Sequence, residues 1–137
     1  WEPWVTKSKA AGGNIIFTSA DIPDTILDSV AVTPKTMKSK KAELEAFLAA
    51  IDKGVAYLRS NQDESAKIIG KVLDTPPADI IEMLETDKIY DLAENKELYS
   101  SGKANLSLEK VTSFLIEKDL IKDKDGADSL LTDSFIK

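Results

Sequence analysis

The sequence predicts a mostly helical α/β fold with two short strands and about five helices. Two short apolar runs are bounded by turn-forming residues, as buried strands are. Beyond residue 34, apolar residues recur at spacings of three and four, as on the buried face of a helix. Two strands do not make a stable sheet. Either the helices cover a small ribbon, or further strands belong to sequence outside these 137 residues.

The first third of the chain contains both predicted strands. A proline at position 3 favours a helix start there, because its missing N–H would be unpaired anyway. Gly12 and Gly13 end that helix. The apolar runs 14–18 and 27–32 are the predicted strands, and residues 19–24 between them have the composition of a loop.

The remainder of the chain is predicted to be helical. Thr33 and Pro34 supply a cap and a first-turn proline for an amphipathic helix that continues to about Leu58. A capping-box pattern at Asn61 opens a second helix, which Gly70 weakens by about 1 kcal/mol relative to alanine. A third helix follows Thr75, and a fourth covers about 106–118.

The composition excludes several functional classes. The chain has 42% hydrophobic and 31% charged residues, which is typical of one globular domain, and no apolar run long enough to span a bilayer. It contains no Cys and no His, which removes the usual thiol nucleophiles, general bases and soft metal ligands. Its net charge of −6 opposes binding to nucleic acid. We therefore expect a protein that is not an enzyme and uses no cofactor and no metal.

The densest group of functional side chains opens the sequence. Trp1, Glu2 and Trp4 lie around a predicted helix start. In one interpretation the indoles pack and Glu2 complements the positive end of the helix dipole. In the other, indole faces, free amides and the Glu2 carboxylate form the wall of a ligand site.

Three residues further along the chain are further candidates, with signals of unequal strength. Asp28 falls inside a predicted buried strand, where a carboxylate is costly unless it is paired or faces a cleft. The alternative is a strand boundary that leaves Asp28 exposed. Ser19 and Asp21, in the preceding loop, carry a weaker signal, since such loops are often only turns.

Two charged segments have simple interpretations. The segment 123–126 fails the pattern of a calcium loop, because Ile121 and Thr132 would occupy positions that require carboxylates. The only basic cluster is at Lys35, Lys38, Lys40 and Lys41. Such a cluster is most often a solvated helix turn, and the alternative is docking to an acidic partner.

Several segments together resemble a known family. They cover nearly the whole chain: 1–4 (Trp-Glu-Pro-Trp), 10–13 (Ala-Ala-Gly-Gly), 15–19 (Ile-Ile-Phe-Thr-Ser), the segment around Asp28, 47–48, 55–61, 90–96 and 131–137. In this order they are similar to the C-terminal half of ABC-transporter substrate-binding proteins of the nitrate/sulfonate/taurine type.

The resemblance implies the C-terminal part of a type II periplasmic-binding-protein fold. In such proteins two α/β lobes close on a small polar or anionic organic molecule and deliver it to a membrane permease. Residues 1–26 would end the second lobe, and 27–137 would return to the first lobe and pack on it. The implied ligand contacts are Trp1, Glu2, Ser19 and Asp28. The implied location is the periplasm or a membrane-tethered position outside the cell, and the N-terminal half of the same protein would cover this chain.

Two other functional classes fit parts of the sequence. An autonomous helical interaction module would account for the amphipathic helices and the basic cluster. An enzyme on the same fold would resemble the pyrimidine-synthesis relatives of the family, but the absence of His and Cys counts against it.

Overall fold

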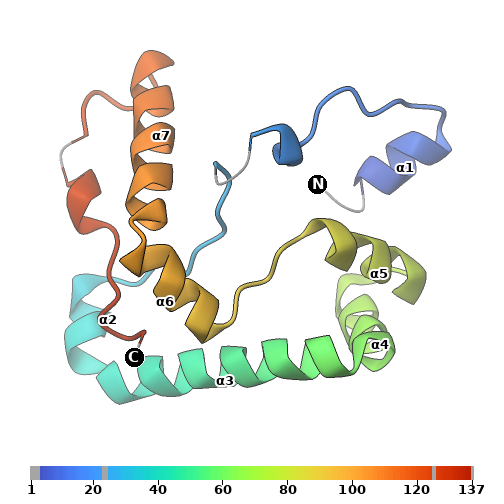
Figure 1. Ribbon diagram of the computed structural model, residues 1–137, viewed down its shortest axis with the longest axis horizontal. Coiled ribbons are helices and arrows are strands. Elements are labelled where there is room, and N and C mark those ends of the chain that lie inside the picture. Colours follow the sequence, from blue (N-terminus) through green and yellow to red (C-terminus); the bar gives the residue numbers. More distant parts are fainter. Residues whose placement is uncertain (1–3, 23–24, 125, 137) are drawn as a thin grey trace. The chain divides into compact units, whose positions relative to one another are not determined.

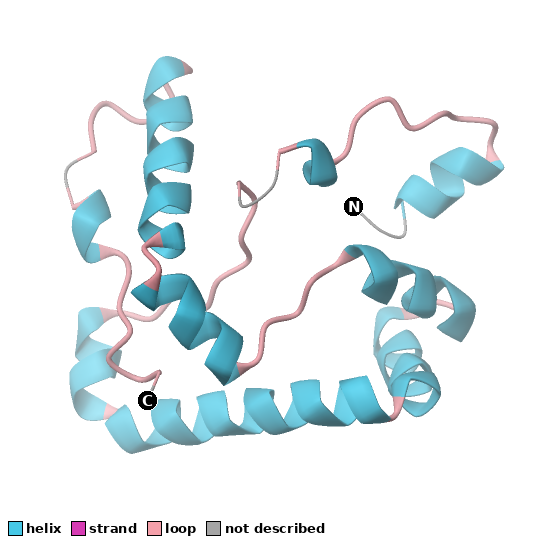
Figure 2. Cartoon of the chain, in the orientation of Figure 1, coloured by secondary structure: helices cyan, strands magenta, loops and turns pink. Residues whose placement is uncertain are grey.

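All regular elements described by the computed structural model, which covers residues 4–22, 25–124 and 126–136, are helices (Figure 2). In chain order they are α1 (Trp4–Ala10), η1 (Ser19–Asp21), α2 (Pro34–Ser39), α3 (Lys41–Ser60), α4 (Gln62–Leu73), α5 (Pro77–Thr86), α6 (Leu92–Ser100), α7 (Lys103–Glu117) and η2 (Ala127–Ser129). The labels η1 and η2 mark single 3-10 turns. The predicted α/β class, and with it a type II binding-protein fold with two strands, is wrong for this chain.

The two predicted strands are loops in the structure (Figure 2). A strand requires a neighbouring strand that pairs with its backbone N–H and C=O groups. Neither 14–18 nor 27–32 has such a neighbour among the described residues. Their apolar side chains therefore remain exposed, with Ile16 at 95% and Val30 at 65%. The apolar runs exist as predicted, but no sheet buries them.

The predicted helices are present with shifted bounds. The long helix predicted from Pro34 is divided at Lys40 into α2 and α3. Thr33 caps α2 as predicted, because its hydroxyl oxygen accepts a hydrogen bond from the Thr36 N–H at 3.2 Å. The helix α6 was not predicted, because its sequence shows no clear apolar face.

The chain divides into two compact units, and the first contains the part up to Phe17 together with Ala50–Asp91. Its centre is the contact between α4 and α5 (Figure 1). Ala66 is fully buried there, and Ile80 is 1% exposed. The Lys9 ammonium forms an ion pair with Glu82 at 3.1 Å, which joins α1 to α5.

The second unit contains Thr18–Ala49 and the chain from Leu92 onward. Here α6 and α7 are joined by Gly102, whose φ of 77° suits a residue without a side chain. The buried face of α7 consists of small residues, namely Ala104, Ser107 and Thr112. The turn η2 packs against α7. The predicted lobe boundary after residue 26 is not tested by these units and stays a prediction.

The described part of the chain buries few apolar side chains. Val55, Ala66, Ile80 and Ala104 are its buried hydrophobic residues, and no described helix is long and apolar enough to cross a membrane. The accessible surface is 10564 Å². Two separate compact domains of half this mass would together expose only about 8,500 Å². The accessible surface of the chain is therefore larger than that of two compact domains of the same total mass.

Candidate functional site

The predicted ligand residues at the start of the chain, Trp1 and Glu2, lie outside the described residues. Their neighbour Trp4 begins α1, and its side chain is 66% exposed. The Lys7 ammonium lies 4.8 Å from the centroid of the Trp4 ring. A cation at this distance is attracted by the electron-rich ring face. A positive charge of the chain itself therefore occupies one face of this indole.

Ser19 lies in a turn that other residues hold in place. The Asp21 carboxylate accepts a hydrogen bond from the Thr18 N–H at 2.7 Å, and the Thr18 hydroxyl oxygen accepts one from the Ala20 N–H at 3.2 Å. These reciprocal bonds form a capping box. The Ser19 side chain takes no part in it and is exposed. The turn thus holds the backbone of Ser19 in place and leaves its hydroxyl exposed.

The same bonds assign a structural role to Asp21. Its carboxylate oxygen accepts from the Thr18 N–H and also lies 3.3 Å from the Thr18 hydroxyl. Asp21 therefore acts within its own turn, and Ser19 is the better candidate for a ligand contact.

Asp28 is exposed, as the second interpretation of the sequence proposed. The reason is the absence of a strand and not a shifted boundary. Within the described chain its carboxylate makes no hydrogen bond or ion pair. No such bond joins Asp28 to Ser19 either, so the structure presents two separate exposed polar groups in one unit.

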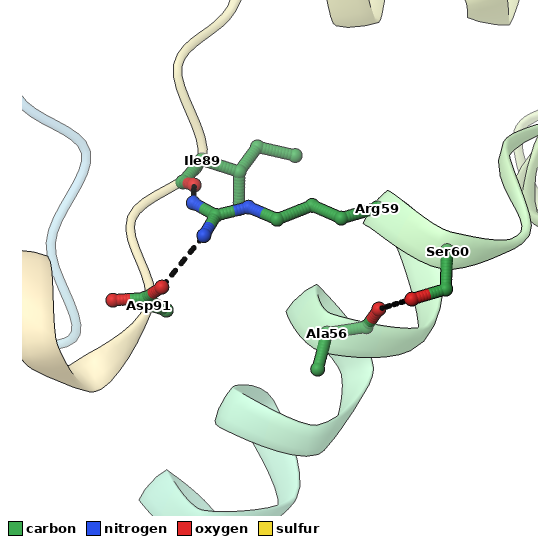
Figure 3. A network of polar contacts seen from close by, with 5 residues as sticks. All are labelled: Ala56, Arg59, Ser60, Ile89 and Asp91. Carbon is green, nitrogen blue, oxygen red and sulfur yellow. Dashed lines mark hydrogen bonds and ion pairs between the residues drawn. The ribbon is translucent and has the colours of Figure 1, made fainter.

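A polar network that was not predicted lies in the first unit (Figure 3). The Arg59 guanidinium donates to the Asp91 carboxylate at 2.6 Å and to the Ile89 carbonyl at 3.0 Å. One residue thus fixes the segment after α5 against the end of α3. The sequence held a signal, because Arg59 is the only arginine in the chain.

Two tyrosines have shifted acidities. Burial raises the pKa of the Tyr99 hydroxyl above its ordinary 10.0, and the negative charge of Asp133 raises it further. A hydrogen bond to Glu64 is the main cause of the raised pKa of Tyr57. Both hydroxyls hold their protons more firmly than usual, so neither is suited to act as a base near neutral pH.

The surface hollow on α7 does not form a ligand pocket. It is lined by six residues of this one helix, at spacings that place them on one face: Leu106, Glu109, Lys110, Ser113, Phe114 and Glu117. Ligand sites surround most of the molecule that they bind, which a single helix face does not do. Among the described residues no group of three or more carboxylates is arranged to hold a metal ion.

Comparison with known proteins adds no relative. No protein family, no curated protein and no solved structure matches this sequence.

Proposed function

We propose that this chain is the C-terminal part of the solute-binding component of an ABC importer, located in the periplasm or tethered outside the cell. The ordered series of segments that resemble the nitrate/sulfonate/taurine family carries this proposal. The ligand is a small polar or anionic organic molecule such as a sulfonate, taurine, nitrate or a pyrimidine-like compound. The complex then docks on a membrane permease.

The exposed apolar surface supports the same proposal. Ile16, Phe17 and Val30 lie in loops and are more than half exposed. Large apolar side chains gain free energy when another segment removes them from water. In the proposal, the N-terminal half of the same protein covers them.

Ser19 and Asp28 are the proposed ligand contacts within the described chain. Both side chains are exposed and have no partner there. A hydroxyl donates to an anionic oxygen, whereas a carboxylate accepts from an ammonium or hydroxyl group. A ligand that contacts both residues would therefore carry an anionic and an ammonium group, as taurine does, and would not be a bare inorganic anion. Trp1 and Glu2 stay predictions from the resemblance.

Calorimetry on the full-length protein tests the proposal, with taurine, alkanesulfonates, nitrate and pyrimidine precursors as ligands. We expect heat with at least one of them. Ser19→Ala and Asp28→Glu should each weaken binding about ten-fold, since a hydrogen bond to a charged group contributes about 1.5–3 kcal/mol. Matched controls on exposed helix positions, Ser113→Ala and Asp63→Glu, should leave the affinity unchanged. The absence of heat with every ligand would overturn the proposal.

A second function, an autonomous helical interaction module, is favoured by one observation. All described regular elements are helices, and the helix faces still expose apolar side chains such as Phe47, Val72 and Phe114. A module of this kind should be a folded monomer that melts in one cooperative step. Association of the isolated chain would instead support the solute-binding proposal.

A further inference from the structure

The most concentrated charge in the chain is a group of four lysines, Lys35, Lys38, Lys40 and Lys41, which we call the lysine cluster. All four side chains are exposed, and within the described chain none of them forms an ion pair. No Asp or Glu occurs from residue 29 to residue 42. The rest of the chain has 14 basic and 24 acidic residues, and therefore a net charge of −10.

The cluster lies where two helices meet in the second unit (Figure 1). Lys35 is in the first turn of α2, and Lys41 is the first residue of α3. Lys40 joins them: its N–H donates to the Thr36 carbonyl at 2.9 Å, and its carbonyl accepts from the Leu44 N–H at 3.0 Å. The backbone of Lys40 thus ends one helix and begins the next.

Helix stability accounts for only part of the lysine cluster. The N-terminal end of a helix carries partial positive charge, so a cation there is unfavourable. Lys35 and Lys41 occupy such ends, and the Lys40 side chain has no acceptor with which to cap α3. Lys38, in the last turn of α2, is placed where the helix dipole favours a cation. Lys40 is the C-cap residue of α2, where a cation is also favourable, but it stands equally at the start of α3, where a cation is unfavourable.

We infer that the lysine cluster is a docking surface for an acidic segment of a partner protein. Seven residues, mostly helical, span only about 10 Å, which matches a short run of carboxylates. A long polyanion such as nucleic acid would extend beyond the cluster and meet the net negative charge of the rest of the chain. This inference does not depend on solute capture, because none of the proposed ligand contacts is involved.

Fluorescence anisotropy with the 137-residue chain tests the inference. The probe is a labelled 12-residue peptide in which glutamate alternates with alanine, and its comparison peptide carries glutamine in place of glutamate. We expect binding of the glutamate peptide only. Binding should weaken at least ten-fold when NaCl is raised from about 50 to 300 mM, because exposed charge pairs are screened.

Two variants, each with four lysines replaced and therefore with the same net charge, serve as a comparison. They distinguish binding by the lysine cluster from a general effect of positive charge. Lys→Gln at positions 35, 38, 40 and 41 should weaken peptide binding at least ten-fold and leave the melting temperature unchanged or raised. Lys→Gln at 53, 67, 71 and 110, all exposed positions in helices, should reduce affinity less than two-fold. Equal losses in both variants would overturn the inference.

Other polyanions complete the test. Vesicles containing phosphatidylserine and a short DNA duplex, measured under the same conditions, should bind more weakly than the glutamate peptide. If either bound more tightly and lost that binding in the variant at positions 35, 38, 40 and 41, the partner would not be a protein and the inference would be wrong. Absence of peptide binding at low salt would also overturn it.

Discussion

At the scale of single residues, two glycines inside helices have opposite roles. A Cβ on Gly70 in α4 would lie 2.5 Å from the Thr75 carbonyl oxygen and 3.6 Å from Cγ1 of Ile80. A Cβ on Gly54 in α3 would meet no atom within 4 Å. Gly70 therefore permits close packing of the turn between α4 and α5, whereas Gly54 only loosens its helix.

We predict that Gly70→Ala destabilises the protein. Helix propensity alone would favour alanine by about 1 kcal/mol, but the contact with backbone forces a shift that costs about 1–3 kcal/mol. The measurement is urea unfolding followed by helical circular dichroism. Gly54→Ala is the matched control and should raise stability by about 0.5–1 kcal/mol. A gain for both variants would show that the α4–α5 turn is looser than described.

At this scale the sequence indicated which residues to consider, but it did not predict the contacts that surround them. It selected Asp28 because a carboxylate fell inside a predicted buried strand, and Ser19 because of the family resemblance. Both side chains are exposed and have no partner in the described part of the chain. It predicted that Gly70 weakens its helix, because helix propensity describes a residue in isolation. Propensity takes no account of the Thr75 carbonyl, which lies where a Cβ on residue 70 would be. The sequence did not assign a role to Arg59, whose partners lie 30 and 32 residues away.

At the scale of elements, the Arg59 contacts determine how the segment after α5 is held. A planar guanidinium can donate to Asp91 and to the Ile89 carbonyl at once, whereas an ammonium is a single point charge. We predict that Arg59→Lys releases this segment and speeds limited chymotrypsin cleavage after Tyr90 about five-fold. This corresponds to a loss of about 1 kcal/mol, reasonable for a partly exposed pair.

The ion pair between Lys9 and Glu82 provides the control for this experiment. It lies in the same unit, and its side chains are 50% and 43% exposed. Lys9→Gln should leave the rate of cleavage after Tyr90 unchanged. If both variants speeded cleavage equally, the effect would reflect general loosening and not the Arg59 contacts.

The elements that the sequence predicted correctly are those with a local signal. The apolar period of α3 and the proline before α5 are properties of adjacent residues, and these helices are present. Strands depend on distant partners, which is why the apolar runs 14–18 and 27–32 were wrongly predicted as strands. The helix α6 was missed because its own residues do not form a clear apolar stripe along one face.

At the scale of the whole molecule, the excess of exposed apolar surface leads to a prediction. We expect the isolated 137-residue chain to associate as its concentration rises and to bind a hydrophobic dye such as ANS, because exposed Ile16, Val72 and Phe114 gain by leaving water. Sedimentation velocity and dye fluorescence measure this. Addition of the N-terminal half should suppress both effects, whereas a monomer that melts in one step without dye binding would favour the interaction module.

The loop around Asp28 also bears on solubility. Residues 25–33 contain eight uncharged residues, several of them β-branched, no proline and no glycine, and Asp28 is their only charge. Segments of this composition stack with copies of themselves, and a single charge commonly prevents it. We therefore expect Asp28, the residue proposed to contact the ligand, also to oppose stacking of this segment on copies of itself. For this reason Asp28→Glu, which retains the charge, tests ligand recognition more cleanly than Asp28→Ala, whose loss of binding could come from aggregation alone.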